Sequence, residues 1–212
     1  MADPTWLAVV VPGHGERVDD LARVVTALAG AGAEVRGVEW SGTDAPLVTD
    51  FEPVADEVAA ELSAGPGLVF GYGVGGMIAV RHAQRYPEQV TALVLAAPVL
   101  GPWPVLDLLS DGEPDGMVGS YRRATLAAID ECLSTIDFDH PLGDELPALW
   151  LHGDDDRLVP VADARAGMDR VRGLRFEERI YPGIGHDLLH GSHAGGVLAD
   201  ITAFAGRVVQ PS

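Results

Sequence analysis

The chain has 212 residues, 47% of them hydrophobic, which suffices for one sizeable core in a single domain spanning residues 1–212. Its formal net charge of −18, from 14 Lys and Arg against 32 Asp and Glu, opposes binding to nucleic acid and to anionic membrane surfaces. A single cysteine permits no internal disulfide, and the apolar run at residues 6–11 is too short to span a membrane, so we expect a cytoplasmic protein without membrane insertion.

Apolar runs alternate along the chain with segments of helical periodicity, a pattern typical of a parallel sheet covered by helices on both faces. The expected strands are residues 5–11, 34–39, 67–70, 90–96, 148–151 and 174–180. One helical face is formed by Val18, Leu21, Val25 and Leu28, and another by Val54, Val58 and Leu62. Further helices are expected over residues 75–86, which Pro87 ends, and over residues 193–208.

Four loops that follow expected strands carry residues suited to catalysis. The sequence PGHGE occupies residues 12–16, and GYGVGG occupies residues 71–76. HGDDDRLVP, with Asp156, occupies residues 152–160, and YPGIGHD, with His186, occupies residues 181–187. Taken singly, loop histidines and aspartates are common on surfaces, and Asp154 to Asp156 also suit a solvated acidic turn or a weak cation site. Their joint position at the ends of successive strands favours a catalytic constellation.

These motifs, in this order, resemble those of the α/β-hydrolase superfamily, nearest its esterase and monoacylglycerol-lipase-like branch, over nearly the whole chain. The family's nucleophile pattern is G-x-S-x-G, and Gly73 stands where the serine belongs. The 12–16 loop is similar to a His-Gly-x-Gly-Glu loop with Pro12 in place of the first histidine. The resemblance implies a minimal α/β-hydrolase fold, a mostly parallel sheet of about six strands that begins at the family's third strand. It requires neither a metal nor an organic cofactor.

The resemblance also assigns roles to the residues around Gly73. Asp156 and His186 match the acid and the base, in the chain order of this family. The N–H groups of Val74 and His14 would form the oxyanion hole. Tyr72 flanks the site as a candidate for substrate binding, with simple packing as the alternative.

Residues 98–143 depart from the strand–helix alternation and lie where this family inserts a lid over the site. Within this segment, Trp103, Leu106 and Leu109 are candidates for lining an apolar pocket for an acyl or aromatic group. The alternative is that they cover the sheet edge. The expected partner is a small, partly apolar substrate: an ester, a thioester or a lactone.

The glycines at 71, 73 and 76 also spell G-x-G-x-x-G, the fingerprint of a dinucleotide-binding fold. That fold needs an acidic residue about 20 positions further on, at the end of the next strand. Here the next expected strand ends in Ala97 and Pro98, and Glu88 precedes it. The hydrolase interpretation also explains the Asp156 and His186 loops, so we favour it.

Three accounts of Gly73 remain open from the sequence. The chain is an engineered variant that lost its nucleophile, an enzyme whose His186 and Asp156 work without a covalent intermediate, or a pseudoenzyme that binds a small apolar ligand or a partner. The N-myc downstream-regulated family has this fold and also carries a glycine at the nucleophile position. No substitute nucleophile is evident, because Ser120 and Cys132 fall in the lid segment and Ser192 follows the histidine loop.

Overall fold

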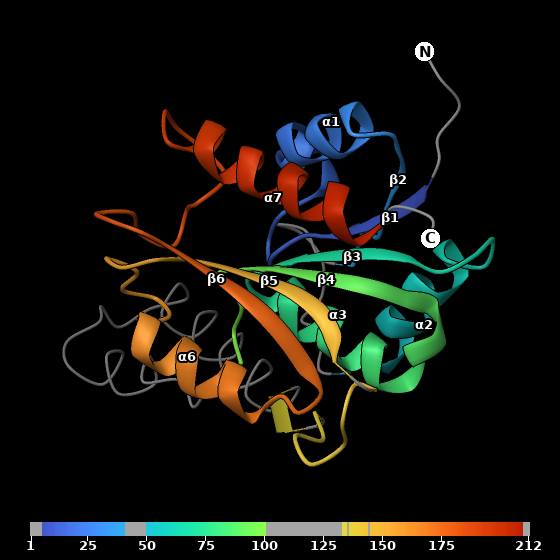
Figure 1. Cartoon of the computed structure of the whole chain (residues 1–212). Coiled ribbons are helices and arrows are strands. Elements are labelled where there is room, and N and C mark those ends of the chain that lie inside the picture. Colours follow the sequence, from blue (N-terminus) through green and yellow to red (C-terminus); the bar gives the residue numbers. More distant parts are fainter. Residues whose placement is uncertain (1–5, 41–49, 101–132, 135, 144, 210–212) are drawn as a thin grey trace, which may run out of the picture.

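The computed structural model describes residues 6–40, 50–100, 133–134, 136–143 and 145–209 (Figure 1). Six strands form one sheet in the order β2-β1-β3-β4-β5-β6, and every neighbouring pair is parallel. The strands are β1 (Trp6–Val11), β2 (Ala33–Gly37), β3 (Gly67–Tyr72), β4 (Val90–Ala96), β5 (Leu146–Gly153) and β6 (Leu174–Tyr181). The predicted α/β class and six-stranded sheet are therefore confirmed.

Helices cover both faces of the sheet (Figure 1). The helices α1 (Ala22–Gly30) and α7 (Ala194–Val208) pack on one face, where Leu28, Phe70 and Ile201 share a core. On the other face lie α2 (Glu52–Glu61), α3 (Val74–Arg85) and α6 (Val161–Arg170), with Val58 and Met77 in a second core. Of the helices in the described ranges, none has the length and apolar character needed to cross a membrane.

The structure corrects several expected boundaries. β3 continues two residues past its expected end because Gly71 and Tyr72 still pair with β4. β5 gains residues at both ends through pairing with β6 along its whole length. The expected N-terminal helical segment begins as a 3₁₀ turn (Val18–Leu21), and in α1 Val24 rather than Val25 is buried.

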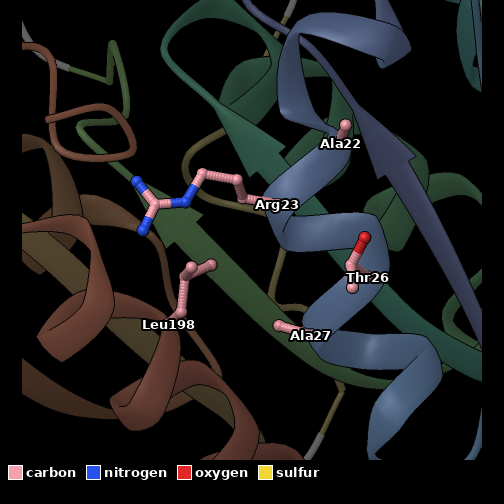
Figure 2. Close-up of a pocket in the computed structure, with 5 residues that line it drawn as sticks. All are labelled: Ala22, Arg23, Thr26, Ala27 and Leu198. Atoms are coloured by element: carbon pink, nitrogen blue, oxygen red, sulfur yellow. The ribbon is translucent and has the colours of Figure 1, made fainter.

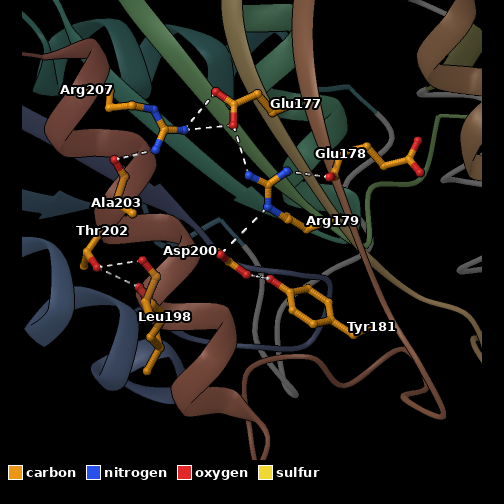
Figure 3. A network of polar contacts seen from close by, with 10 residues as sticks. Glu177, Glu178, Arg179, Tyr181, Leu198, Asp200, Thr202, Ala203 and Arg207 are labelled. Carbon is orange, nitrogen blue, oxygen red and sulfur yellow. Dashed lines mark hydrogen bonds and ion pairs between the residues drawn. The ribbon is translucent and has the colours of Figure 1, made fainter.

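The edge strand β6 is tied to α7 by polar contacts (Figure 3). The guanidinium of Arg207 on α7 donates to both carboxylate oxygens of Glu177 at 2.8 Å. Arg179 lies 3.2 Å from the same carboxylate, and the hydroxyl of Tyr181 donates to Asp200 at 2.8 Å. Alternate side chains of β6 therefore hold the last helix against the edge of the sheet.

Most of the expected lid lies outside the described residues, and Trp103, Leu106 and Leu109 fall there too. The beginning of the segment is described, and Val99 and Leu100 are buried in the core beside α3. Near its end, Leu133 and Ile136 are buried in the same core. The single domain and the lid boundaries stay predictions.

Candidate active site

The turn between β3 and α3 places Gly73 in a backbone conformation that side chains rarely adopt. Its φ is 55° and its ψ is −118°, and it immediately precedes the first residue of α3. The Gly73 N–H donates to Ala96 O at 2.9 Å, and the Gly73 carbonyl accepts from the N–H groups of Gly76 and Val99. The turn is thus held by main-chain hydrogen bonds that do not depend on the side chain at position 73. An L side chain here would be strained.

The glycines of this turn differ in the space around them. A Cβ atom built on Gly71 would lie 2.5 Å from Gly75 O, and one built on Gly75 would lie 2.3 Å from Val11 O. These two glycines are required for the close approach of main chains. At Gly73 the nearest atoms would be His186 Nε2 at 3.5 Å and Gly13 Cα at 3.9 Å. A Cβ at position 73 would therefore contact His186 without clashing with any described residue.

His186 and Asp156 come together from the loops that follow β6 and β5. His186 Nδ1 lies 2.8 Å from Asp156 Oδ2, and the opposite nitrogen, Nε2, is the one that faces Gly73. Asp156 is buried, and its Oδ1 accepts the N–H groups of Leu158 and Val159 at 2.9 Å each. Burial raises the pKa of Asp156, but hydrogen bonds from His152 and His186 and the N–H of Val159 more than offset it. The pKa of Asp156 is therefore held well below its usual range.

Tyr72 packs beneath the histidine loop. Its hydroxyl donates to the carbonyl of His186 at 3.1 Å, and its ring stacks on the imidazole with a centroid distance of 5.6 Å. Burial is the largest cause of the raised pKa of Tyr72, so its hydroxyl stays protonated. These contacts give Tyr72 a part in holding His186, and its predicted contact with substrate stays a prediction.

The loop after β1 lies against the turn at Gly73. Gly13 N–H donates to Glu16 Oε2 at 3.0 Å, and Glu16 N–H donates to Gly13 O at 3.2 Å. Trp40, which is buried, holds the loop, because its Nε1–H donates to Pro12 O at 2.8 Å and its ring packs edge-on with that of His14. Burial raises the pKa of Glu16 and lowers that of His14. The two hydrogen bonds between Gly13 and Glu16 hold the backbone on both sides of His14 and so help to orient its N–H.

The acidic turn after β5 divides its carboxylates among different partners. Asp154 accepts the N–H of Gly183 at 2.6 Å, and Asp155 lies 3.6 Å from Arg157 at the exposed surface. Only Asp156 of the three contacts His186 among the described residues. Within the described ranges no three His, Cys, Asp or Glu side chains are grouped to hold a metal ion. The weak cation site considered from the sequence gains no support.

A shallow hollow of about 380 Å³ lies between α1 and α7 (Figure 2). It is lined by Ala22, Arg23, Thr26, Ala27 and Leu198. Arg23 donates to the carbonyl of Gly191 at 3.1 Å, which links this hollow to the loop that follows His186.

Residues 2–114 match the sequence model of the family described as serine aminopeptidase, S33. The chain belongs to this family. It is 26% identical over 248 residues to a monoacylglycerol lipase of Mycolicibacterium smegmatis, covering 95% of this chain and 88% of the lipase. It is 31% identical over 142 residues to a pimeloyl-[acyl-carrier protein] methyl ester esterase of Neisseria meningitidis, covering 59% of this chain and 52% of the esterase.

The solved monoacylglycerol lipase of Paleococcus ferrophilus superposes with a TM-score of 0.76 at 16% identity, over 97% of this chain and 96% of that one. At such identity the likeness shows the fold alone. Together with the family match and the monoacylglycerol lipase relative, it confirms the predicted α/β-hydrolase fold and the resemblance to the monoacylglycerol-lipase-like branch.

The structure brings together Gly73, Val74, Asp156 and His186 and places the loop of His14 beside them. The sequence did not point to three further residues near the site: Glu16, Trp40 and His152. Glu16 closes a motif that was recognised for other reasons, and His152 is a polar residue at the end of an apolar run. Trp40 left no signal, because its contact with Pro12 joins residues far apart in the sequence.

Proposed function

We propose that this protein hydrolyses a small, partly apolar carboxylic ester with water as the attacking nucleophile and without a covalent intermediate. The observation that carries the proposal is the geometry at Gly73. His186, paired with Asp156, directs Nε2 at the position where a side chain of residue 73 would begin. A Cβ there would make only ordinary contacts with the described residues, whereas one at Gly71 or Gly75 would clash with the main chain. A group that takes a proton must lie within hydrogen-bond reach of it, and a water molecule beside Gly73 would meet that condition.

In the proposed hydrolysis, a few groups of the protein each have one role. His186 Nε2 takes a proton from water as the water oxygen bonds to the ester carbonyl carbon. The carbonyl oxygen becomes an oxyanion, for which the N–H groups of Val74 and His14 are the proposed donors. Val74 is suited to this because it opens α3, and the first N–H groups of a helix have no acceptor within it. The tetrahedral intermediate then loses the alcohol, which takes its proton from His186, and Asp156 accepts from Nδ1–H throughout.

The named relatives support an ester as the substrate class. A monoacylglycerol lipase and a methyl ester esterase both act on carboxylic esters, and thioesters and lactones present the same carbonyl carbon. The proposed apolar lining by Trp103, Leu106 and Leu109 and the cytoplasmic location belong to the same proposal. In subtilisin variants without the triad, catalysis roughly 10³–10⁴ above water remains, so slow turnover is expected here.

A non-catalytic binding protein is the second candidate, and Gly73 itself favours it, since the position lacks an attacking atom. A panel of acyl esters tested with the parent protein and with His186→Ala separates the two. Hydrolysis that depends on His186 supports the enzyme. Equal backgrounds in the two proteins, with ligand binding retained, support the binding protein.

A further inference from the structure

A second histidine, His152, also contacts Asp156. It is the penultimate residue of β5 and is fully buried. Its Nε2 lies 2.8 Å from Val159 O and 3.3 Å from Asp156 Oδ2. Its Nδ1 lies 3.4 Å from Nε1 of Trp150, which can only donate.

The partners of His152 fix its tautomer. A carbonyl oxygen and a carboxylate oxygen both accept, so Nε2 must carry the proton. The indole N–H of Trp150 donates, so Nδ1 must offer its lone pair. His152 is therefore the Nε2–H tautomer, with its proton directed at Val159 and close to Asp156.

The contact with Val159 acts on the turn that carries Asp156. The N–H of Val159 donates to Asp156 Oδ1, while the carbonyl of Val159 accepts from His152. Residues 156–159 are thus closed on themselves by the aspartate and fastened to the end of β5 by the histidine. The remaining carboxylate oxygen, Oδ2, faces Nε2 of His152 and Nδ1 of His186 together.

We propose that His152 is a positioning residue: by pinning the turn at Val159 and facing Asp156 Oδ2, it directs that oxygen at His186. A buried carboxylate that is held on every side keeps one rotamer, and the imidazole bound to it keeps one orientation. The catalytic consequence rests on the proposed function, but the arrangement of the two histidines around Asp156 does not.

The chain offers a matched control in His82 of α3. His82 is also fully buried, and its Nδ1 lies 3.1 Å from a main-chain oxygen, that of Ala55. No carboxylate contacts it among the described residues, and its Nε2 has no hydrogen-bond partner there. Replacing His82 therefore measures the cost of losing a buried histidine that has no link to Asp156.

The first test is NMR of the ¹⁵N-histidine-labelled parent, which needs no turnover. We expect the His152 signals of an Nε2–H tautomer, and Asp156→Asn should shift the His152 Nε2 resonance. A proton on Nδ1 of His152, or a resonance unmoved by Asp156→Asn in a folded protein, overturns the proposal.

The second test compares His152→Leu, His152→Gln and His82→Leu. The Nδ1 proton signal of His186 should broaden or move in His152→Leu, return toward the parent position in His152→Gln, and stay unchanged in His82→Leu. If the parent hydrolyses esters, kcat should fall about tenfold in His152→Leu with KM nearly unchanged, the size expected for one hydrogen-bond contact to a charged group.

An unchanged His186 signal in folded His152→Leu contradicts the positioning role, as does an equal change in His82→Leu. If His152→Leu does not fold, the parent tautomer and the Asp156→Asn shift still decide. A parent without any ester turnover would end the proposed function and leave the NMR outcomes to decide on His152.

Discussion

The turn at Gly73 and the loop at Asp156 both face His186, but they differ in the side-chain groups that they offer it. At Gly73 the turn is held by main-chain hydrogen bonds, and the position has no side chain. At Asp156 the carboxylate is buried, receives two main-chain N–H groups and meets two histidines. A buried carboxylate is costly to maintain, and well-packed apolar residues often serve stability as well or better. The difference supports the proposed hydrolysis, in which His186 and Asp156 act without a serine.

Restoring the missing atom should have the largest effect. In Gly73→Ser the hydroxyl would lie within reach of His186 Nε2, since the added Cβ itself would lie 3.5 Å from that nitrogen. Ester hydrolysis should rise by roughly 10³-fold or more, since loss of the serine costs about 10⁶ in subtilisin. Initial rates on an ester panel and labelling of position 73 by a fluorophosphonate measure this. A folded Gly73→Ser protein that neither labels nor hydrolyses would show that the neighbouring loops are not catalytic.

Removing the charge of Asp156 tests the other region. In Asp156→Asn the amide can donate to His186 and so favours the wrong tautomer, and any His186-dependent turnover should fall by up to about 10⁴, the cost of the same change in a serine protease. Asp154→Asn is the matched control, because Asp154 lies in the same turn and accepts from the N–H of Gly183. Equal losses in the two variants would argue for damage to the turn rather than to the acid–base pair.

The glycines of the turn between β3 and α3 should differ in their tolerance of a methyl group. Gly75→Ala places Cβ against main-chain oxygens of Val11 and Pro12, which cannot move aside cheaply, and we expect a loss of at least about 3 kcal/mol in unfolding free energy. The Cβ of Gly73→Ala makes only ordinary van der Waals contacts, 3.5 Å from His186 Nε2 and 3.9 Å from Gly13 Cα, so the variant bears mainly the strain of positive φ, about 1–3 kcal/mol. Chemical denaturation of both variants checks the order. A reversed order would mean that position 73 is more crowded than its neighbours.

The loop after His186 should show a small dependence of stability on pH. His190 Nδ1 lies 2.6 Å from Asp187 Oδ1 and Nε2 lies 3.1 Å from Asp20 O, so both nitrogens face acceptors and the charged ring is favoured. The hydrogen bond with Asp187 is the main cause of the raised pKa of His190. Because the folded pKa exceeds the unfolded one, this contribution is fully present below about pH 6.5 and is lost as the pH rises through the folded value.

The melting temperatures of the parent and His190→Asn, followed from pH 5 to 9, measure this contribution. The parent should have its advantage at the acidic end and lose it toward the alkaline end. An advantage that grows with pH would show that the neutral ring is the stabilising form.

The fold and the pairing of Asp156 with His186 could be predicted from the sequence because both leave local signals, while their catalytic roles stay predictions. Apolar runs mark β3 and β4, and the chain order of Gly73, Asp156 and His186 matches a known family pattern. α6 left little signal, since its buried face is made of Ala164, Gly167 and Met168, two of which are small. The hydrogen bond between His152 and Val159 depends on the shape of the turn after β5, which the spacing of apolar residues does not predict. The contact of Trp40 with Pro12 spans 28 residues and arises only when β1 and β2 pair.

The charged row along β6 also bears on how the protein behaves in a crowded solution. An edge strand exposes unpaired main-chain groups that can recruit a strand from another molecule, and charged side chains are a common defence. β6 carries Arg175, Glu177, Glu178 and Arg179, and the links from Glu177 and Arg179 to α7 keep part of this charge at the rim of the sheet (Figure 3). These charged side chains disfavour strand addition and aggregation. Variants that strain the turn at Gly73 should therefore fail by unfolding rather than by growing fibrils from this edge.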